Sequence, residues 1–287
     1  MKEGIYMKYA NLHLHSTHSD SEITPRDLAI LAKEIGHSAA ALTDHDVISG
    51  TKEFMEAAKE VGLETIAGVE FYGEKWGVNF HVVGYDFDIE DKELNRFIDT
   101  LCENRNTHTR ILVENGIKRG TLKDITWDEI VDLNPEATWF CNNQVFRAMA
   151  KKGVLDMKER AHLLKVNFKS EPAFKVKIEV PSLEESVERI IKAGGVAGIA
   201  HPHNQYKYVK RMLDEGIPIG LVEVSHPILT KDEEKAFYDL ALEHNLYKTG
   251  GTDHHGRLSA IPDRIHNHED SGVLKEDFIE LKERRLG

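Results

Sequence analysis

Cysteine is scarce in this 287-residue chain, which contains only Cys102 and Cys141. Two cysteines without Cys-x-x-Cys spacing do not suggest a disulfide framework. No apolar run approaches the roughly 20 residues that a membrane-spanning helix needs. The first eight residues also lack the apolar core of a secretory signal. We therefore expect a cytoplasmic protein with no membrane partner.

Basic charge is also in short supply. Lysine and arginine number 37 against 49 acidic residues, which gives a formal net charge of -12. A non-specific binder of long nucleic acid needs a basic face, so that class of partner is not expected. A small phosphorylated substrate is still compatible with this charge, because bound divalent ions would invert the local field. The oligomeric state has no signature in the sequence.

Apolar runs alternate with amphipathic stretches at both ends of the chain. Buried apolar strands separated by helices indicate an α/β fold with a parallel sheet and helices outside it. Seven strands are predicted, at 9–15, 38–43, 63–69, 79–85, 196–200, 219–224 and 246–249. The main helices between them are predicted at 25–35, 50–61, 182–193, 205–214 and 231–244.

The alternation stops in the middle of the chain. From 89 to 175 the pattern predicts one helix after another and no strand. We interpret 89–175 as a helical insertion, or cap, and 1–88 together with 176–287 as the α/β unit. In α/β barrels the chemistry lies at the carboxyl ends of the strands, so candidate residues are sought there.

Sixteen histidines are the unusual feature, and several follow predicted strands. His13 and His15 are two residues apart on a predicted strand and therefore share a face. Most of the candidates lie where a strand gives way to a loop, and there are nine: His13, His15, Asp20, His45, Glu70, His81, His201, Asp253 and His255. Imidazole and carboxylate ligands suit zinc, manganese or iron. Nine ligands are too many for one ion and suit two or three.

The order of these motifs resembles that of a known family. His-x-His, Asp20, Thr-Asp-His-Asp, Gly-Val-Glu, His81-Val-Val-Gly, Ala-His-Pro and Thr-Asp-x-His are similar to the motifs of the PHP (polymerase and histidinol phosphatase) metal-dependent phosphoesterases, in their nucleotide phosphoesterase branch. The resemblance implies a distorted seven-stranded (β/α) barrel with a trinuclear metal site.

The resemblance also implies how the ligands divide. His13, His15, Glu70 and Asp253 would hold one ion. Glu70 would bridge to a second ion, which His81 and His201 would also hold. Asp20, His45 and His255 would hold the third.

Clustered divalent ions make hydrolysis the natural chemistry, because they deprotonate a shared water and clamp phosphoryl oxygens. We expect hydrolysis of a small phosphomonoester or nucleotide phosphate by a metal-bridging hydroxide, with Glu70 and Asp253 at the catalytic centre. His203 and His226 are candidates for the acid that protonates the leaving group. Two alternatives stay open: a histidinol-phosphate phosphatase, and a metal-binding regulatory module without catalysis.

Two stretches depart from the branch. Cys141-Asn142-Asn143-Gln144 stands where members often carry Arg-Pro-His, and His203-Asn204 follows the His-Pro where members often carry arginine. Arginine is the preferred bidentate partner of phosphate. We therefore expect weak activity on 3′,5′-bisphosphorylated nucleotides. Four basic residues are potential replacements, although each is typical of an exposed surface charge: Arg147, Lys207, Arg211 and Arg257.

Overall fold

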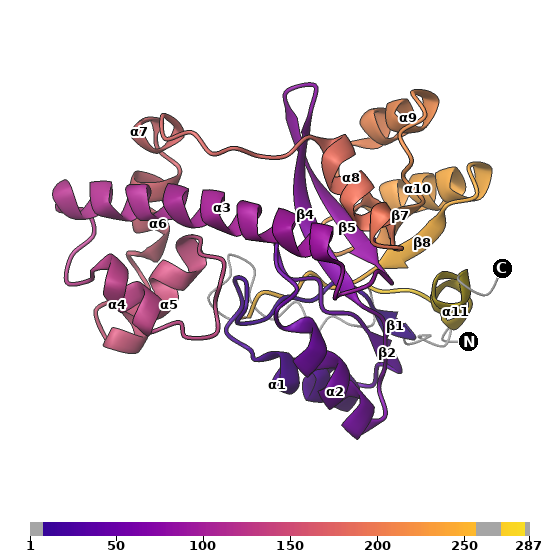
Figure 1. Cartoon of the computed structure of the whole chain (residues 1–287), viewed down its shortest axis with the longest axis horizontal. Helices are drawn as coiled ribbons and strands as arrows, with labels where there is room; N and C mark the ends of the chain where they lie inside the picture. Colours follow the sequence, from indigo (N-terminus) through magenta and orange to yellow (C-terminus); the bar gives the residue numbers. More distant parts are fainter. Residues whose placement is uncertain (1–7, 257–270, 285–287) are drawn as a thin grey trace.

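The computed structural model describes residues 8–256 and 271–284, and its strands form two sheets. The smaller sheet is parallel and has the order β1 (Ala10–Asn11), β2 (Ala39–Ala40), β3 (Glu64–Thr65). The larger sheet has the order β4 (Gly68–Lys75), β5 (Val78–Tyr85), β6 (Val196–Ile199), β7 (Leu221–Ser225), β8 (Tyr247–Gly250). Figure 1 shows both sheets near the centre of the molecule.

Short hydrogen-bonded segments join the two sheets on both sides. On one side the Leu12 N–H donates to the Gly250 carbonyl at 3.0 Å, and the His15 N–H donates to the His254 carbonyl at 3.2 Å. On the other side His45 and Glu70 form an isolated parallel bridge. The segments that follow β1, β2 and β8 are thereby brought beside β4.

The expectation of a parallel sheet is confirmed for β1–β3 and for β6–β8 but is wrong at β5. β5 runs antiparallel to both β4 and β6. Trp76 and Gly77 connect β4 to β5 with φ angles of 56° and 72°, and two residues with positive φ are the turn that matches the twist of a hairpin. The predicted strand at 63–69 is divided between β3 and β4, so the described residues contain eight strands rather than seven.

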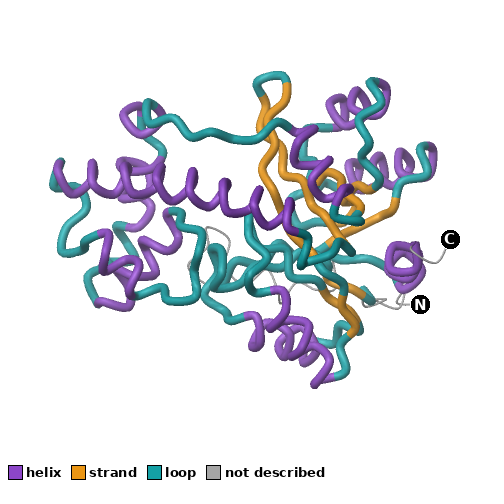
Figure 2. The backbone as a smooth tube through the Cα atoms, in the orientation of Figure 1, coloured by secondary structure: helices purple, strands orange, loops and turns teal. Residues whose placement is uncertain are grey.

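Helices cover the outer faces of the sheets (Figure 2). The first pair is α1 (Pro25–Glu34) and α2 (Thr51–Val61), and the later ones are α8 (Leu183–Lys192), α9 (Tyr206–Asp214), α10 (Lys231–Glu243) and α11 (Lys275–Glu283). Thr24 caps α1, and Pro25 occupies its first turn as expected. The largest core cluster joins β4 and β5 to the apolar side of α8, which includes Leu183, Val187 and Ile190.

The segment between β5 and α8 is helical, as predicted. It contains α3 (Lys92–Lys118), α4 (Trp127–Asp132), α5 (Asn142–Lys152), α6 (Arg160–Phe168) and α7 (Glu171–Phe174). These helices gather on one side of the molecule in Figure 1 and have a core cluster of their own around Val113, Ile130 and Phe146. The first half of α3 packs in the larger cluster through Phe97, Ile98 and Leu101. Among the described helices, none is both long enough and apolar enough to cross a bilayer.

Gly198 in β6 permits the close approach of β7, and this contact leads to a prediction. A Cβ at Gly198 would lie 1.8 Å from the Leu221 carbonyl oxygen. Gly198→Ala should therefore destabilise the fold by about 3 kcal/mol or more, as overpacking does at its upper end. The control is Gly62→Ala, which has a φ of 69° and nothing within 4 Å of the new Cβ. It should lose only about 1 kcal/mol, the backbone cost of the left-handed conformation. Urea unfolding followed by circular dichroism measures both, and equal losses would contradict the steric explanation.

Candidate metal centre

Glu70 lies at the centre of the site. Its side chain is fully buried in β4, and its neighbours Val69 and Phe71 pack in the core. Its Oε1 atom lies 2.8 Å from His81 Nδ1 and 2.9 Å from His201 Nε2. Its Oε2 atom faces three further rings, at 2.9 Å from His45 Nδ1 and 3.4 Å from Nε2 of both His13 and His15. One carboxylate thus has a different set of imidazoles at each oxygen.

His13 and His15 reach this carboxylate because the chain is extended after β1. Their rings lie 5.2 Å apart, while the alternate residues Leu12 and Leu14 are buried in core clusters. Asp253 approaches from the segment that follows β8. Its Oδ1 atom is 3.1 Å from His15 Nε2 and 3.6 Å from His13 Nε2. The two histidines therefore share two carboxylates, which is the arrangement of a candidate metal ligand set.

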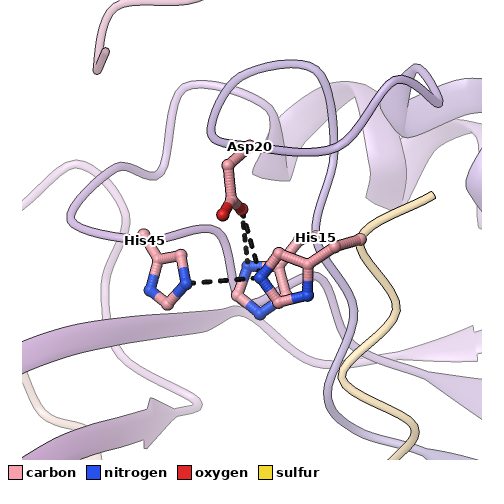
Figure 3. A group of neighbouring side chains, drawn as sticks. His15, Asp20 and His45 are labelled. Carbon is pink, nitrogen blue, oxygen red and sulfur yellow. Dashed lines mark hydrogen bonds and ion pairs between the residues drawn. The ribbon is translucent and has the colours of Figure 1, made fainter. Parts of the chain in front are cut away.

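A further set of candidate metal ligands surrounds Asp20. Its Oδ1 atom lies 3.2 Å from His255 Nε2 and 3.9 Å from His15 Nδ1. The Nε2 atoms of His255 and His45 are 3.4 Å apart. Figure 3 shows the Asp20 carboxylate directed towards His15, with the His45 ring beside them. Four side chains each offer one ligand atom that is close enough to the others for a single ion to bind all four: His15, Asp20, His45 and His255.

Glu223 belongs to the site, although the sequence analysis missed it. It is fully buried in β7, where its Oε2 accepts the His201 backbone N–H at 2.6 Å. Its two carboxylate oxygens lie 3.2 and 3.3 Å from His13 Nδ1. A carboxylate behind a ligand histidine fixes the tautomer of the ring and orients it. The signal in the sequence was an acidic residue inside the apolar run of 221–224.

The two candidates for the leaving-group acid lie in different surroundings. His226 Nδ1 accepts the Ile228 N–H at 3.1 Å, so a neutral ring carries its hydrogen on Nε2, which is 3.4 Å from Asp253 Oδ2. His203 is half-exposed, and its Nδ1 lies 3.0 Å from Glu233 in α10. The structure therefore places His226 behind Asp253, and His203 beside Glu233.

The atoms at the centre fit divalent ions. Several buried polar atoms there have no hydrogen-bond partner: His13 Nε2, both ring nitrogens of His15, His45 Nδ1 and Glu70 Oε2. Leaving such atoms unsatisfied is costly, and metal coordination is a way to satisfy them. Imidazole and carboxylate donors without thiolate match zinc, manganese and iron equally well. These clusters are consistent with a centre that holds more than one ion.

The protonation states of Glu70 and His15 suit ligation. Metal binding at His45 would instead release a proton, because burial is outweighed by the charges of Glu70 and Asp20, which raise the pKa of this ring to about 9. Burial would raise the pKa of Glu70, but the charges of His45, His13 and His81 outweigh it and hold the pKa well below its ordinary value. Burial lowers the pKa of His15 to about 3, and the charges of His255 and His45 act in the same direction. A charged carboxylate and a neutral imidazole are the forms that bind metal ions.

The insertion holds the loop that presents Asp20. Arg147 of α5 is only 6% exposed and donates to the carbonyl oxygens of Ser21 and Thr17. The expectation that Arg147 is an exposed charge is therefore wrong. The Asn143 amide donates to Asp20 Oδ2 at 3.2 Å. Of the other basic candidates, Arg211 pairs with Glu215, Lys207 lies over the Tyr208 ring, and Arg257 falls outside the described residues.

We predict different metal losses for two variants of the centre. Glu70→Gln removes a negative charge that both ligand sets share, so purified protein should lose about two metal equivalents and essentially all turnover. His45→Ala removes an imidazole near Asp20 and should lose about one. Metal analysis with circular dichroism as the folding control measures both. Equal losses from two folded variants would mean that Glu70 does not bridge.

Arg147 gives a second prediction. Arg147→Met leaves the Ser21 and Thr17 carbonyls without their donor, so the loop should hold Asp20 less firmly and occupancy should fall by about one ion. Lys152→Met on the same helix removes a charge that is ion-paired with Glu129, and it should leave the metal content unchanged. Full occupancy in a folded Arg147→Met protein would show that the loop keeps its place without α5.

Comparison with known proteins agrees with the geometry. The PHP domain model matches residues 11–193. The chain is 28% identical to a 3′,5′-nucleoside bisphosphate phosphatase of Chromobacterium violaceum, over 98% of this chain and 99% of that protein. It is 29% identical to a 5′-3′ exoribonuclease of Haemophilus influenzae, over 86% of this chain and 90% of that protein. Its fold matches a solved structure from Bifidobacterium adolescentis described as a metal-dependent phosphoesterase, with a TM-score of 0.79, 23% identity and coverage of 95% and 94%. This chain therefore belongs to the PHP domain family and is a metal-dependent phosphoesterase.

Proposed function

We propose that the chain hydrolyses a small phosphomonoester, and specifically a nucleotide phosphate, at the Glu70 centre. The observation that carries this proposal is the pair of ligand sets on the two oxygens of Glu70, because a shared carboxylate holds two divalent ions close together. Paired ions are suited to both the attacking and the leaving oxygens of a phosphoryl group. The names of the two relatives support a nucleotide as the substrate.

The ligands would divide into three sets, as the resemblance to the family implies. His13, His15 and Asp253 would hold one ion with Glu70 Oε2, and His81 and His201 would hold another with Glu70 Oε1. Asp20, His45 and His255 would hold the third. When bound, manganese, zinc or iron would supply Lewis-acid charge and lower the pKa of water.

Two residues of the chain keep these ligands in place. Glu223 holds the His13 ring through Nδ1, which leaves Nε2 directed at Glu70. His226 Nε2 lies 3.4 Å from Asp253 Oδ2, close enough to orient that carboxylate. We therefore assign His226 a positioning role. His203, which is engaged by Glu233, is likewise not our choice for the proton donor.

Arg105 of α3 is a cation that lies beside the aromatic rings next to the centre. Its guanidinium lies 4.7 Å from the Tyr72 ring and 5.3 Å from the Trp139 ring. Those rings stack on His45 at 5.4 and 5.6 Å, and the Arg105 Nε atom is buried without a hydrogen-bond partner. We propose that Arg105 binds the scissile phosphate beside this aromatic wall.

The fold proposal follows from the same contacts. We infer that the two sheets and the hydrogen bonds that join them are the two arcs of a distorted barrel, formed by residues 1–88 and 176–287. Residues 89–175 would form the cap. Because Asn143 and Arg147 support the Asp20 loop, the cap completes the centre as well as covering it.

A substrate panel tests the function. The metal-loaded protein is assayed with p-nitrophenyl phosphate, nucleoside monophosphates, a nucleoside 3′,5′-bisphosphate, histidinol phosphate and a short 5′-phosphorylated RNA. We expect phosphate release that is highest on nucleotides and is abolished by a chelator and by Glu70→Gln. Highest activity on histidinol phosphate would favour that phosphatase instead. If metal binds at full stoichiometry and no substrate turns over, the chain is a binding module and the proposal fails.

A further inference from the structure

We infer that Arg160, supported by Asn143, forms an anion subsite that selects a nucleotide with a second phosphate. This inference rests on the proposed function and names the substrate class of the same site. It concerns a residue of α6, an element that contributes no metal ligand in the division of sites proposed above.

Asn143 connects Arg160 to the metal centre. The Asn143 amide nitrogen donates to Asp20 Oδ2 at 3.2 Å, while its Oδ1 accepts from the Arg160 guanidinium at 3.3 Å. The Asn142 amide donates to the same Oδ1 at 2.9 Å. A guanidinium thus lies one side chain away from the carboxylate of a candidate metal ligand, at the start of α5.

The hydrogen-bond donors of Arg160 have few acceptors within the protein. Its only hydrogen bond to another described residue is the long one to a neutral amide, and its Nε atom is buried without a partner. In the described parts of the chain, no carboxylate lies within ion-pair distance of it, whereas Arg110 and Arg189 are each paired with a glutamate. Its guanidinium lies 5.1 Å from the Phe146 ring, which restrains the side chain. A restrained, partly buried guanidinium with unused donors is suited to a phosphate.

The position of Arg160 can compensate for the arginine motif that is missing from this chain. Cys141-Asn142-Asn143 lacks the arginine that similar sequences often carry there, but Arg160 comes to Asn143 from another helix. The positive charge at this place is therefore supplied by α6. With Arg160 at this place, the inference is opposite to the weak activity on 3′,5′-bisphosphates that the sequence predicts. We expect one phosphate to lie at the metal centre and the distal phosphate to lie at Arg160.

The test compares a nucleoside 3′,5′-bisphosphate with the nucleoside monophosphate that lacks the distal phosphate. Wild type should prefer the bisphosphate, and Arg160→Gln should lower the ratio of the two kcat/KM values by about tenfold or more, because a charge-assisted hydrogen bond is lost. Arg160→Lys should recover part of the ratio, since it keeps the charge without the planar fork. Lys165→Gln is the matched control, because it removes an exposed charge from the same helix and should leave the ratio unchanged.

Metal content and thermal melting are measured for each variant, because Arg160 contacts Asn143 and Asn143 contacts Asp20. An equal fall on both substrates, or an unchanged ratio in Arg160→Gln, overturns the inference. A short 5′-phosphorylated RNA is assayed alongside, and an Arg160-dependent preference for it over the bisphosphate would show that the subsite takes an internal phosphodiester instead, which overturns the assignment of a bisphosphate.

A binding measurement distinguishes a failure of this inference from a failure of the proposed function. If wild type turns over neither nucleotide, the proposed function fails, and calorimetric titration of the metal-loaded protein with both nucleotides decides the subsite alone. A tighter Kd for the bisphosphate that is lost in Arg160→Gln supports the subsite. Equal Kd values in wild type contradict it.

Discussion

The structure depends on the burial of one carboxylate. Glu70 is fully buried among five imidazoles, and a buried charge is tolerated only when opposite charges or metal ions compensate it. The strand that carries Glu70 is held by antiparallel pairing with β5, which also carries His81. The other rings come from segments after β1, β2 and β6, so correct assembly of both sheets is a condition for placing this one charge.

The helices between β5 and α8 contribute both to the core and to the support of the Asp20 loop. Helix α3 completes the core beside β4, and helix α5 binds the loop that presents Asp20 through Arg147 and Asn143. If this segment is a cap, as proposed, its contacts with the Asp20 loop would link the substrate face to the metal centre. Changes in the insertion are therefore expected to alter both selectivity and metal occupancy, and loss of the insertion would not leave an intact centre.

Much of the site is readable from the sequence, because ligand pairs follow strands. His13 and His15 alternate along an extended segment, and His45 follows β2, whereas Glu70 lies within β4 and not at the strand end where the sequence placed it. The hairpin was missed because the positive φ angles of Trp76 and Gly77 leave little trace in hydrophobic periodicity. Glu223 was hidden by its apolar neighbours in β7. The contact between Arg160 and Asn143 could not be predicted, since it depends on how α6 packs against α5.

The most direct test of the account is anomalous diffraction from crystals of the metal-loaded protein, recorded on either side of the metal absorption edge. The account predicts two peaks that share Glu70, one beside His13 and His15 and the other beside His81 and His201. A third peak should lie between Asp20, His45 and His255. A single peak, or two peaks of which neither contacts Glu70, would contradict a shared carboxylate as the basis of this centre.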